Sequence, residues 1–180
     1  MITLIAGTPD SGKSLLAENI AVKLSGGGKK YYLATMVPFG EEGKMRVEKH
    51  QRMREGKGFI TLEWPDDISL RLNDSMDFSG STILLECMSN LVGNELYSEN
   101  NHGTSDEILS KKIIDAMHKL NAKAKNVIIV TNEFALEDEQ YDAATKRYVK
   151  LIAIVNKALM DMADETYIHK NGEWMSNEAS

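Results

Sequence analysis

The sequence predicts an α/β fold in which helices cover both faces of a mostly parallel β-sheet. Three observations lead to this prediction. Short apolar runs alternate with stretches of helical periodicity along the 180 residues, which is typical of strands joined by crossover helices. Several of these runs are apolar throughout, as expected of strands that are covered on both faces. A glycine-rich loop also lies between the first apolar run and the first helical stretch.

The predicted strands are six short runs rich in apolar and β-branched residues, at 2–6, 30–35, 58–64, 81–87, 126–131 and 165–170. The predicted helices have apolar residues at helical spacing and cover 14–24, 105–123 and 140–163. In the first of these, residues 15, 16, 20 and 24 form the apolar stripe. Thr104 and Glu107 are expected to form the capping box of the second. Asn171-Gly172 lies between strand-like flanks, which predicts a C-terminal hairpin.

Length and composition bound the possible functions. A chain of 180 residues is expected to form a single domain, 1–180. Cys87 is the one cysteine, which excludes an internal disulfide and a cysteine-based metal cluster and suits the cytoplasm. We expect neither a signal peptide nor a membrane span, since no run approaches the ~20 apolar residues that a span needs. The net charge of −6 argues against a dedicated nucleic-acid-binding protein, although residues 44–57 form a basic patch.

The loop GTPDSGKS matches the phosphate-binding pattern G-x-x-x-x-G-K-[ST]. Its glycines, Gly7 and Gly12, let backbone N–H groups curl toward phosphate oxygens. Lys13 would reach the β- and γ-phosphates of a nucleotide, and the Ser14 hydroxyl would hold Mg²⁺. The alternative is an ordinary turn between a strand and a helix. We therefore predict a P-loop nucleotide-binding domain whose nucleotide-binding loop consists of Gly7, Thr8, Pro9, Asp10, Ser11, Gly12, Lys13 and Ser14.

Polar residues at the ends of later strands are further site candidates, because ligands of parallel sheets bind at the carboxyl ends of the strands. Glu86 ends an apolar strand and would bind Mg²⁺ directly or through water; the alternative is an acid that faces solvent. Asn132 follows the strand 126–131 and would contact the nucleotide or only cap the loop. Cys87 is expected to be a small packing residue and not a nucleophile.

Three basic residues of the patch, Arg46, His50 and Arg54, are spaced at i, i+4 and i+8. A helix would place them along one face, with two guanidiniums flanking a histidine that is able to act as a nucleophile toward phosphorus. The alternative is a solvated basic helix face. The other histidines have weaker claims: His102 lies in a polar loop, His118 in an amphipathic helix and His169 in the last strand but one.

The order of these motifs resembles the bifunctional adenosylcobinamide kinase / adenosylcobinamide-phosphate guanylyltransferase family. The likeness covers about 160 residues and keeps the order and the approximate spacing of the family motifs. The matching segments are SGKS at 11–14, YLAT at 32–35, RVEKH at 46–50, TLE at 61–63, LLECMSNLVGNEL at 84–96, VTNE at 130–133, NKAL at 156–159 and ADE at 163–165.

The resemblance implies a RecA-like P-loop fold, Mg²⁺ as cofactor, ATP or GTP as substrate, a corrinoid as the second substrate, and a homotrimer. It implies phosphorylation of adenosylcobinamide and transfer of GMP from GTP to the resulting phosphate through a guanylyl-histidine. His50 matches that histidine, and His50 and Lys13 would be the catalytic residues. Ser14 and Glu86 would bind the metal. The nucleotide-binding set extends to Arg46, Arg54, Glu63 and Asn132.

The chain departs from the family pattern in four places. Gly7 to Asp10 stand where the family has Gly-Gly-x-Arg, and Arg54-Glu55 stands where it has Arg-Pro. Residues 134–140 replace a glycine-rich stretch, and residues 148–150 replace Phe-Arg-Asp. Two alternatives therefore stay open: a P-loop kinase of another small metabolite without a covalent step, or a nucleotide-binding regulatory relative without catalysis.

Overall fold

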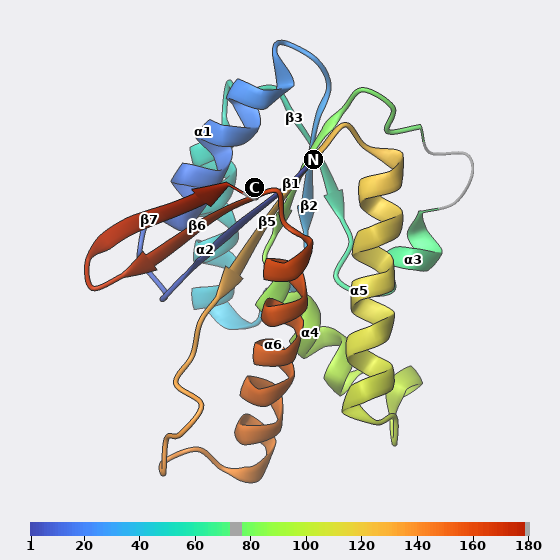
Figure 1. The fold of residues 1–180 in the computed structure, drawn as a ribbon, viewed down its shortest axis with the longest axis vertical. Helices are drawn as coiled ribbons and strands as arrows, with labels where there is room; N and C mark the ends of the chain where they lie inside the picture. Colours follow the sequence, from blue (N-terminus) through green and yellow to red (C-terminus); the bar gives the residue numbers. More distant parts are fainter. Residues whose placement is uncertain (73–76, 179–180) are drawn as a thin grey trace.

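The computed structural model describes residues 1–72 and 77–178 (Figure 1). The strands are β1 Ile2–Gly7, β2 Lys30–Ala34, β3 Phe59–Glu63, β4 Thr82–Glu86, β5 Asn126–Asn132, β6 Glu165–Lys170 and β7 Glu173–Glu178. The helices are α1 Lys13–Ser25, α2 Gly40–Arg54, α3 Ile68–Arg71, α4 Met88–Tyr97, α5 Asp106–Lys123 and α6 Ala143–Met162, with a 3-10 turn, η1, at Glu99–Asn101. Among the described residues, no helix is both long enough and apolar enough to cross a membrane.

The strands form one sheet in the order β3-β2-β4-β5-β1-β6-β7. Every neighbouring pair is parallel except β6 and β7, which form the predicted antiparallel hairpin. Asn171 and Gly172 both have positive φ, as a tight two-residue hairpin turn requires. The register pairs Gly7 with Asn132 and Ala34 with both Glu63 and Glu86. The carboxyl ends of β1 to β5 therefore meet at one edge of the sheet.

Helices cover both faces of this sheet, as the sequence predicts (Figure 1). On one face, Ala17 and Ala21 of α1 pack against buried strand residues such as Ile5 and Leu84. On the other face, α3, α4, α5 and α6 enclose the larger core cluster, in which Phe78 is one of the largest fully buried side chains. The strands between them are covered on both sides, which explains their continuous apolar sequence.

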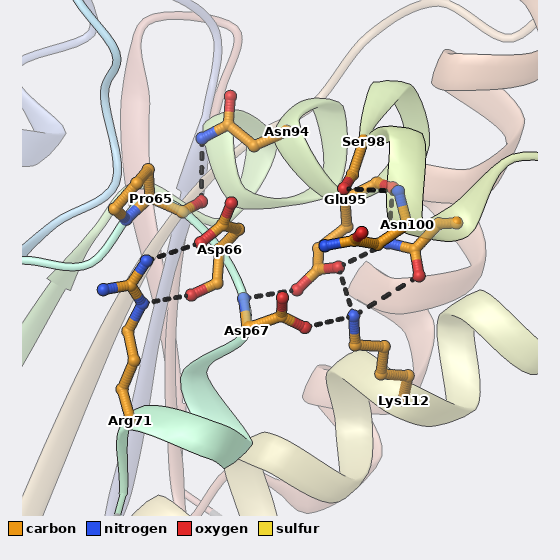
Figure 2. Close-up of polar contacts among 10 residues, drawn as sticks. Pro65, Asp66, Asp67, Arg71, Asn94, Glu95, Ser98, Asn100 and Lys112 are labelled. Carbon is orange, nitrogen blue, oxygen red and sulfur yellow. Dashed lines mark hydrogen bonds and ion pairs between the residues drawn. The ribbon is translucent and has the colours of Figure 1, made fainter.

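A polar cluster joins the helices of the larger face (Figure 2). Lys112 of α5 forms ion pairs with Asp67 at 2.5 Å and with Glu95 of α4 at 2.7 Å. Glu95 also accepts a hydrogen bond from the Asp67 backbone N–H. Asp67 precedes α3, so one lysine holds three helices together.

Two details of the predicted elements are wrong. Helix α5 begins one residue later than expected, and Ser105 caps it by accepting a hydrogen bond from the Ile108 N–H at 3.3 Å; Thr104 is not the cap. In α1, Leu15 is 50% exposed whereas Glu18 is fully buried. Glu18 faces inward because Lys57 supplies a cation at 2.6 Å, a long-range ion pair that helical periodicity cannot predict.

Candidate functional site

The predicted nucleotide-binding loop joins the end of β1 to the start of α1 and forms an open cradle. Gly12 has a φ of 82°, which favours glycine, and no atom lies within 4 Å of the place where its Cβ would be. At Gly7, a Cβ would lie 2.9 Å from Ser11 Oγ and 3.0 Å from His169 Cβ. Glycine is therefore required at position 7 by close packing and at position 12 by backbone conformation.

The outer rim of the cradle consists of the exposed residues Thr8, Pro9 and Asp10. Asp10 has a φ of 61° and lines the edge of the cavity. Because this carboxylate is exposed, water solvates it at the position where the resemblance leads us to expect arginine. Ser11 is half-buried, and its hydroxyl packs toward Gly7, where it has no hydrogen-bond partner among the described residues.

Lys13 lies on the floor of the cradle and is nearly buried. Its Nζ donates a hydrogen bond to the Thr8 carbonyl at 2.8 Å, so the amine is held across the loop. Burial lowers the pKa of Lys13, although the neighbouring Glu86 carboxylate opposes this effect. A phosphate in the cradle would take over the contact with Thr8 and favour the charged amine.

Ser14 and Glu86 form the predicted metal site. The Ser14 hydroxyl donates a hydrogen bond to Glu86 Oε1, although 72 residues separate the two in sequence. Both groups offer oxygen atoms, the ligands that Mg²⁺ prefers. No cluster of three or more His, Cys, Asp or Glu residues is present in the described parts of the chain. Mg²⁺ is commonly bound in proteins through one or two side-chain oxygens together with water and substrate phosphates.

His50 lies on α2 beside this pair. Its Nδ1 is 3.6 Å from Glu86 Oε1, is buried, and has no hydrogen-bond partner among the described residues. A carboxylate facing Nδ1 favours the tautomer with its proton on that nitrogen, which leaves Nε2 with a free electron pair. The predicted nucleophile, metal ligand and phosphate loop therefore meet at one point.

Arg54 anchors the end of α2. Its guanidinium carbon lies 3.4 Å from the centroid of the Tyr32 ring, and its Nη1 donates a hydrogen bond to the His50 carbonyl at 2.9 Å. The Tyr32 hydroxyl in turn donates to Glu86 Oε2 at 3.3 Å. Burial raises the pKa of Tyr32, and the Glu86 carboxylate adds to this effect, so the phenol stays a neutral donor. Tyr32 thus connects the helix that carries His50 to the predicted metal ligand.

Two cavities meet at His50. The phosphate cavity, of about 280 Å³, is lined by the loop together with Arg46, His50, Glu86 and Asn132. The β2–β3 cavity, of about 450 Å³, is lined by His50, Arg54, Glu63 and Glu86 among others. Arg46 and Arg54, the two arginines predicted to flank His50, therefore line different cavities. Arg46 faces the loop, whereas Arg54 faces the second cavity, because stacking on Tyr32 turns it away.

Asn132 lies at the end of β5, and its side-chain amide donates a hydrogen bond to Ser89 Oγ at 2.6 Å. Its carbonyl accepts one from Asn156 of α6 at 3.0 Å. Asn156 also accepts from the Thr131 hydroxyl at 2.7 Å. Asn156, the first residue of the NKAL segment, is buried. Its side-chain amide holds the end of β5 in place beside the phosphate loop.

Cys87 is buried, as expected of a packing residue. Its Sγ lies 3.0 Å from Ser89 Oγ, and burial raises the pKa of the thiol, so the nucleophilic thiolate is disfavoured. Of the other histidines, His102 and His118 are exposed on the surface. His169 stacks edge-on against Trp174, with ring centroids 5.1 Å apart, and packs beside the loop.

Sequence reasoning missed Tyr32 and Asn90 as site residues. Tyr32 belongs to the quoted YLAT segment, so a signal was present, but its contact with Glu86 depends on pairing of β2 with β4. Asn90, in the first turn of α4, lines the phosphate cavity. Asn90 belongs to the quoted LLECMSNLVGNEL segment, so a signal was present, but its place beside the phosphate cavity depends on the packing of α4 against the sheet.

Comparison with known proteins gives one family match. A family model described as cobinamide kinase / cobinamide phosphate guanyltransferase matches residues 3–176. No curated protein matches. Among solved structures, the ATPase domain of G40P has a TM-score of 0.50 and 9% identity, covering 94% of this chain and 69% of that one. The flagellar accessory protein FlaH from Methanocaldococcus jannaschii has a TM-score of 0.46 and 14% identity, covering 97% and 75%. The fold is that of P-loop NTPases.

Proposed function

Because the chain belongs to the cobinamide kinase / cobinamide phosphate guanyltransferase family, we propose that it catalyses both reactions within one nucleotide-binding domain in the cytoplasm. In the first, the γ-phosphoryl group of ATP or GTP passes to the hydroxyl of adenosylcobinamide. In the second, GMP passes from GTP to the phosphate so formed. The observation that supports both is the meeting of the phosphate loop, Glu86 and His50, with His50 Nδ1 3.6 Å from Glu86.

In the phosphoryl transfer, Lys13 and the backbone N–H groups of the loop would hold the β- and γ-phosphates. Ser14 and Glu86 would hold Mg²⁺, which supplies positive charge to the phosphate oxygens. The acceptor hydroxyl attacks the γ-phosphorus, the bond to the β-phosphate oxygen breaks, and the hydroxyl proton is released to a base. Catalysis of this kind rests on positioning and electrostatic stabilisation by the loop.

In the guanylyl transfer, His50 Nε2 attacks the α-phosphorus of GTP, a P–N bond forms and pyrophosphate leaves. A phosphate oxygen of the acceptor then attacks the same phosphorus, and the P–N bond breaks to regenerate the imidazole. The Glu86 carboxylate near Nδ1 would stabilise the imidazolium. Arg46, which lines the phosphate cavity, would neutralise the departing phosphates.

The positions of the two cavities suggest how GTP lies during guanylyl transfer. If the β- and γ-phosphates occupy the loop and the α-phosphorus faces His50, the base extends into the β2–β3 cavity. Glu63 lines that cavity, and a carboxylate is able to accept hydrogen bonds from N1–H and N2–H of guanine but repels the acceptor N1 of adenine. We therefore propose GTP as the donor in this step.

Labelling with GTP that carries ³²P at the α-phosphate tests the proposal. Wild-type protein denatured after incubation should retain acid-labile label, and His50→Ala should retain none. His118→Ala, an exposed histidine on α5, is the matched control and should be labelled normally. Absence of label from wild-type protein that binds GTP would overturn the transferase half.

The departures from the family pattern motivate two alternatives, which the same variants separate. A kinase without a covalent intermediate would keep phosphoryl transfer in His50→Ala and lose it in Lys13→Ala. A regulatory relative would bind nucleotide without turnover of any acceptor, cobinamide included.

A further inference from the structure

A further groove lies between α4 and α6, next to both cavities of the site. We call it the α4–α6 groove; its walls include Pro65, Asn90, Asn94, Tyr97, Thr145 and Tyr148. Its volume is about 560 Å³, within the range of small-molecule sites.

The groove leads to the phosphate cavity. Asn90 lines both spaces. Next to it, Ser89 lines the groove and accepts the hydrogen bond from Asn132, which lines the phosphate cavity. A ligand in the groove is therefore separated from the phosphate loop only by the first turn of α4.

The lining of the groove indicates a neutral ligand. Of the eleven described residues that line it, none is Lys, Arg or His, which argues against a second nucleotide. The one acid, Asp66, is ion-paired with Arg71 at 2.7 Å (Figure 2). The remaining polar groups are amides and hydroxyls, and the apolar surface comes chiefly from Tyr97 and Tyr148 together with Val37 and Pro65.

The floor of the groove is held in place by hydrogen bonds. Asn94 donates from its side-chain amide to the Thr35 carbonyl at 2.7 Å and the Pro65 carbonyl at 2.8 Å. Figure 2 shows the Asn94 amide nitrogen on Pro65 and its amide oxygen pointing away. Tyr148 donates to the Ser89 carbonyl at 3.0 Å. A site that is rigid before binding loses less entropy when the ligand is ordered.

From this geometry we propose that the α4–α6 groove is the acceptor site, which seats the hydroxyl-bearing arm of cobinamide and its neighbouring amide side chains. The inference rests on the proposed function for the identity of the acceptor. The tyrosine rings would pack against the apolar part of the corrin edge, and the amides of Asn90 and Asn94 would pair with its carboxamides. The arm would pass over Asn90, so that its hydroxyl reaches the γ-phosphate in the loop. The groove receives this edge and not the whole macrocycle.

Equilibrium dialysis with dicyanocobinamide, followed by its visible absorption, tests the site without requiring turnover. Tyr97→Ala removes one wall, and Thr145→Trp fills the groove from the first turn of α6. Each should weaken cobinamide binding by about tenfold or more and leave GTP binding unchanged. Ile108→Ala is the matched control, because Ile108 is 62% exposed on α5 and Tyr97 is 63% exposed; it should bind cobinamide like the wild type.

Unchanged cobinamide affinity in both groove variants, or no binding by the wild type, would overturn the acceptor site. The two proposals fail separately. Label on His50 without cobinamide binding would leave the guanylyl chemistry standing, whereas groove-dependent cobinamide binding without label would leave the acceptor site standing.

Discussion

The position of Lys13 on the floor of the phosphate loop predicts how nucleotide affinity depends on pH. Burial lowers its pKa below that of an ordinary lysine, whereas phosphate binding requires the charged amine. As pH rises through this lowered pKa, nucleotide affinity should fall earlier than it would with an exposed lysine. The unliganded protein should become more stable over the same interval, because the unfolded chain holds the proton more tightly.

Titration of GTP affinity from about pH 7 to pH 10 measures this fall. Lys13→Arg keeps its charge throughout, so its affinity, although weaker, should not decline with pH in this interval. Parallel declines in the two proteins would show that Lys13 is not the titrating group.

Tyr32 supports a second prediction, because its hydroxyl and its ring make separate contacts. Tyr32→Phe removes the hydrogen bond to Glu86 and keeps the stacking on Arg54. The less restrained carboxylate should raise the Mg²⁺ concentration for half-maximal phosphoryl transfer severalfold, with little change in rate at saturating Mg²⁺. Tyr32→Leu also removes the stacking and should reduce labelling of His50 at saturating Mg²⁺.

The control for these variants is Tyr31→Phe, since the Tyr31 ring packs on Phe78 in the other core cluster. A Mg²⁺ requirement in Tyr32→Phe equal to that of the wild type would show that the hydroxyl does not position Glu86.

At the scale of elements, the end of α2 is tied to α1 by a buried ion pair. Glu18 is fully buried, and Lys57, just beyond α2, contacts it at 2.6 Å. Lys57→Met leaves a buried carboxylate without its cation and should destabilise the protein by about 3–5 kcal/mol. The double variant Glu18→Leu/Lys57→Met should recover much of this loss, because it removes both charges. Urea unfolding followed by circular dichroism measures the free energy of unfolding of both variants. An equal loss of stability in the single and the double variant would contradict this account.

At the scale of the whole molecule, α2 is poorly covered by the rest of the chain. Of its 15 residues, only Gly43 and Arg54 are buried, and at its start Phe39 and Met45 are 92% and 66% exposed. An isolated helix of this length is marginal in water. We therefore predict that a second copy of the chain covers it, in agreement with the trimer that the resemblance implies. Light scattering should give about three times the chain mass of 20.1 kDa, and Phe39→Asp should lower it. A monomeric wild type would contradict this prediction.

Several features could be predicted from the sequence because they depend on neighbours along the chain. The phosphate loop is one, since Gly7, Gly12, Lys13 and Ser14 all lie within one turn between a strand and a helix. The parallel sheet is another, because continuous apolar runs predict its buried strands. The C-terminal hairpin is a third, because Asn171-Gly172 is a turn sequence between two strand-like segments. Glu86 is predicted from its place at the end of an apolar strand, and His50 from the spacing of the basic residues together with the family motifs. The local sequence does not contain the closeness of these two residues in space.

Only the tertiary structure decided which residues from distant parts of the chain line each of the two cavities of the site. Strand pairing brings Tyr32 to Glu86, and stacking on that ring turns Arg54 away from the loop that Arg46 faces. Packing of α1 on the sheet buries Glu18, which pairs with Lys57, and packing of α4 on α6 forms the groove beside Asn90. These outcomes depend on contacts between residues far apart in the chain, and their energies depend on burial, which exists only once the layers have assembled.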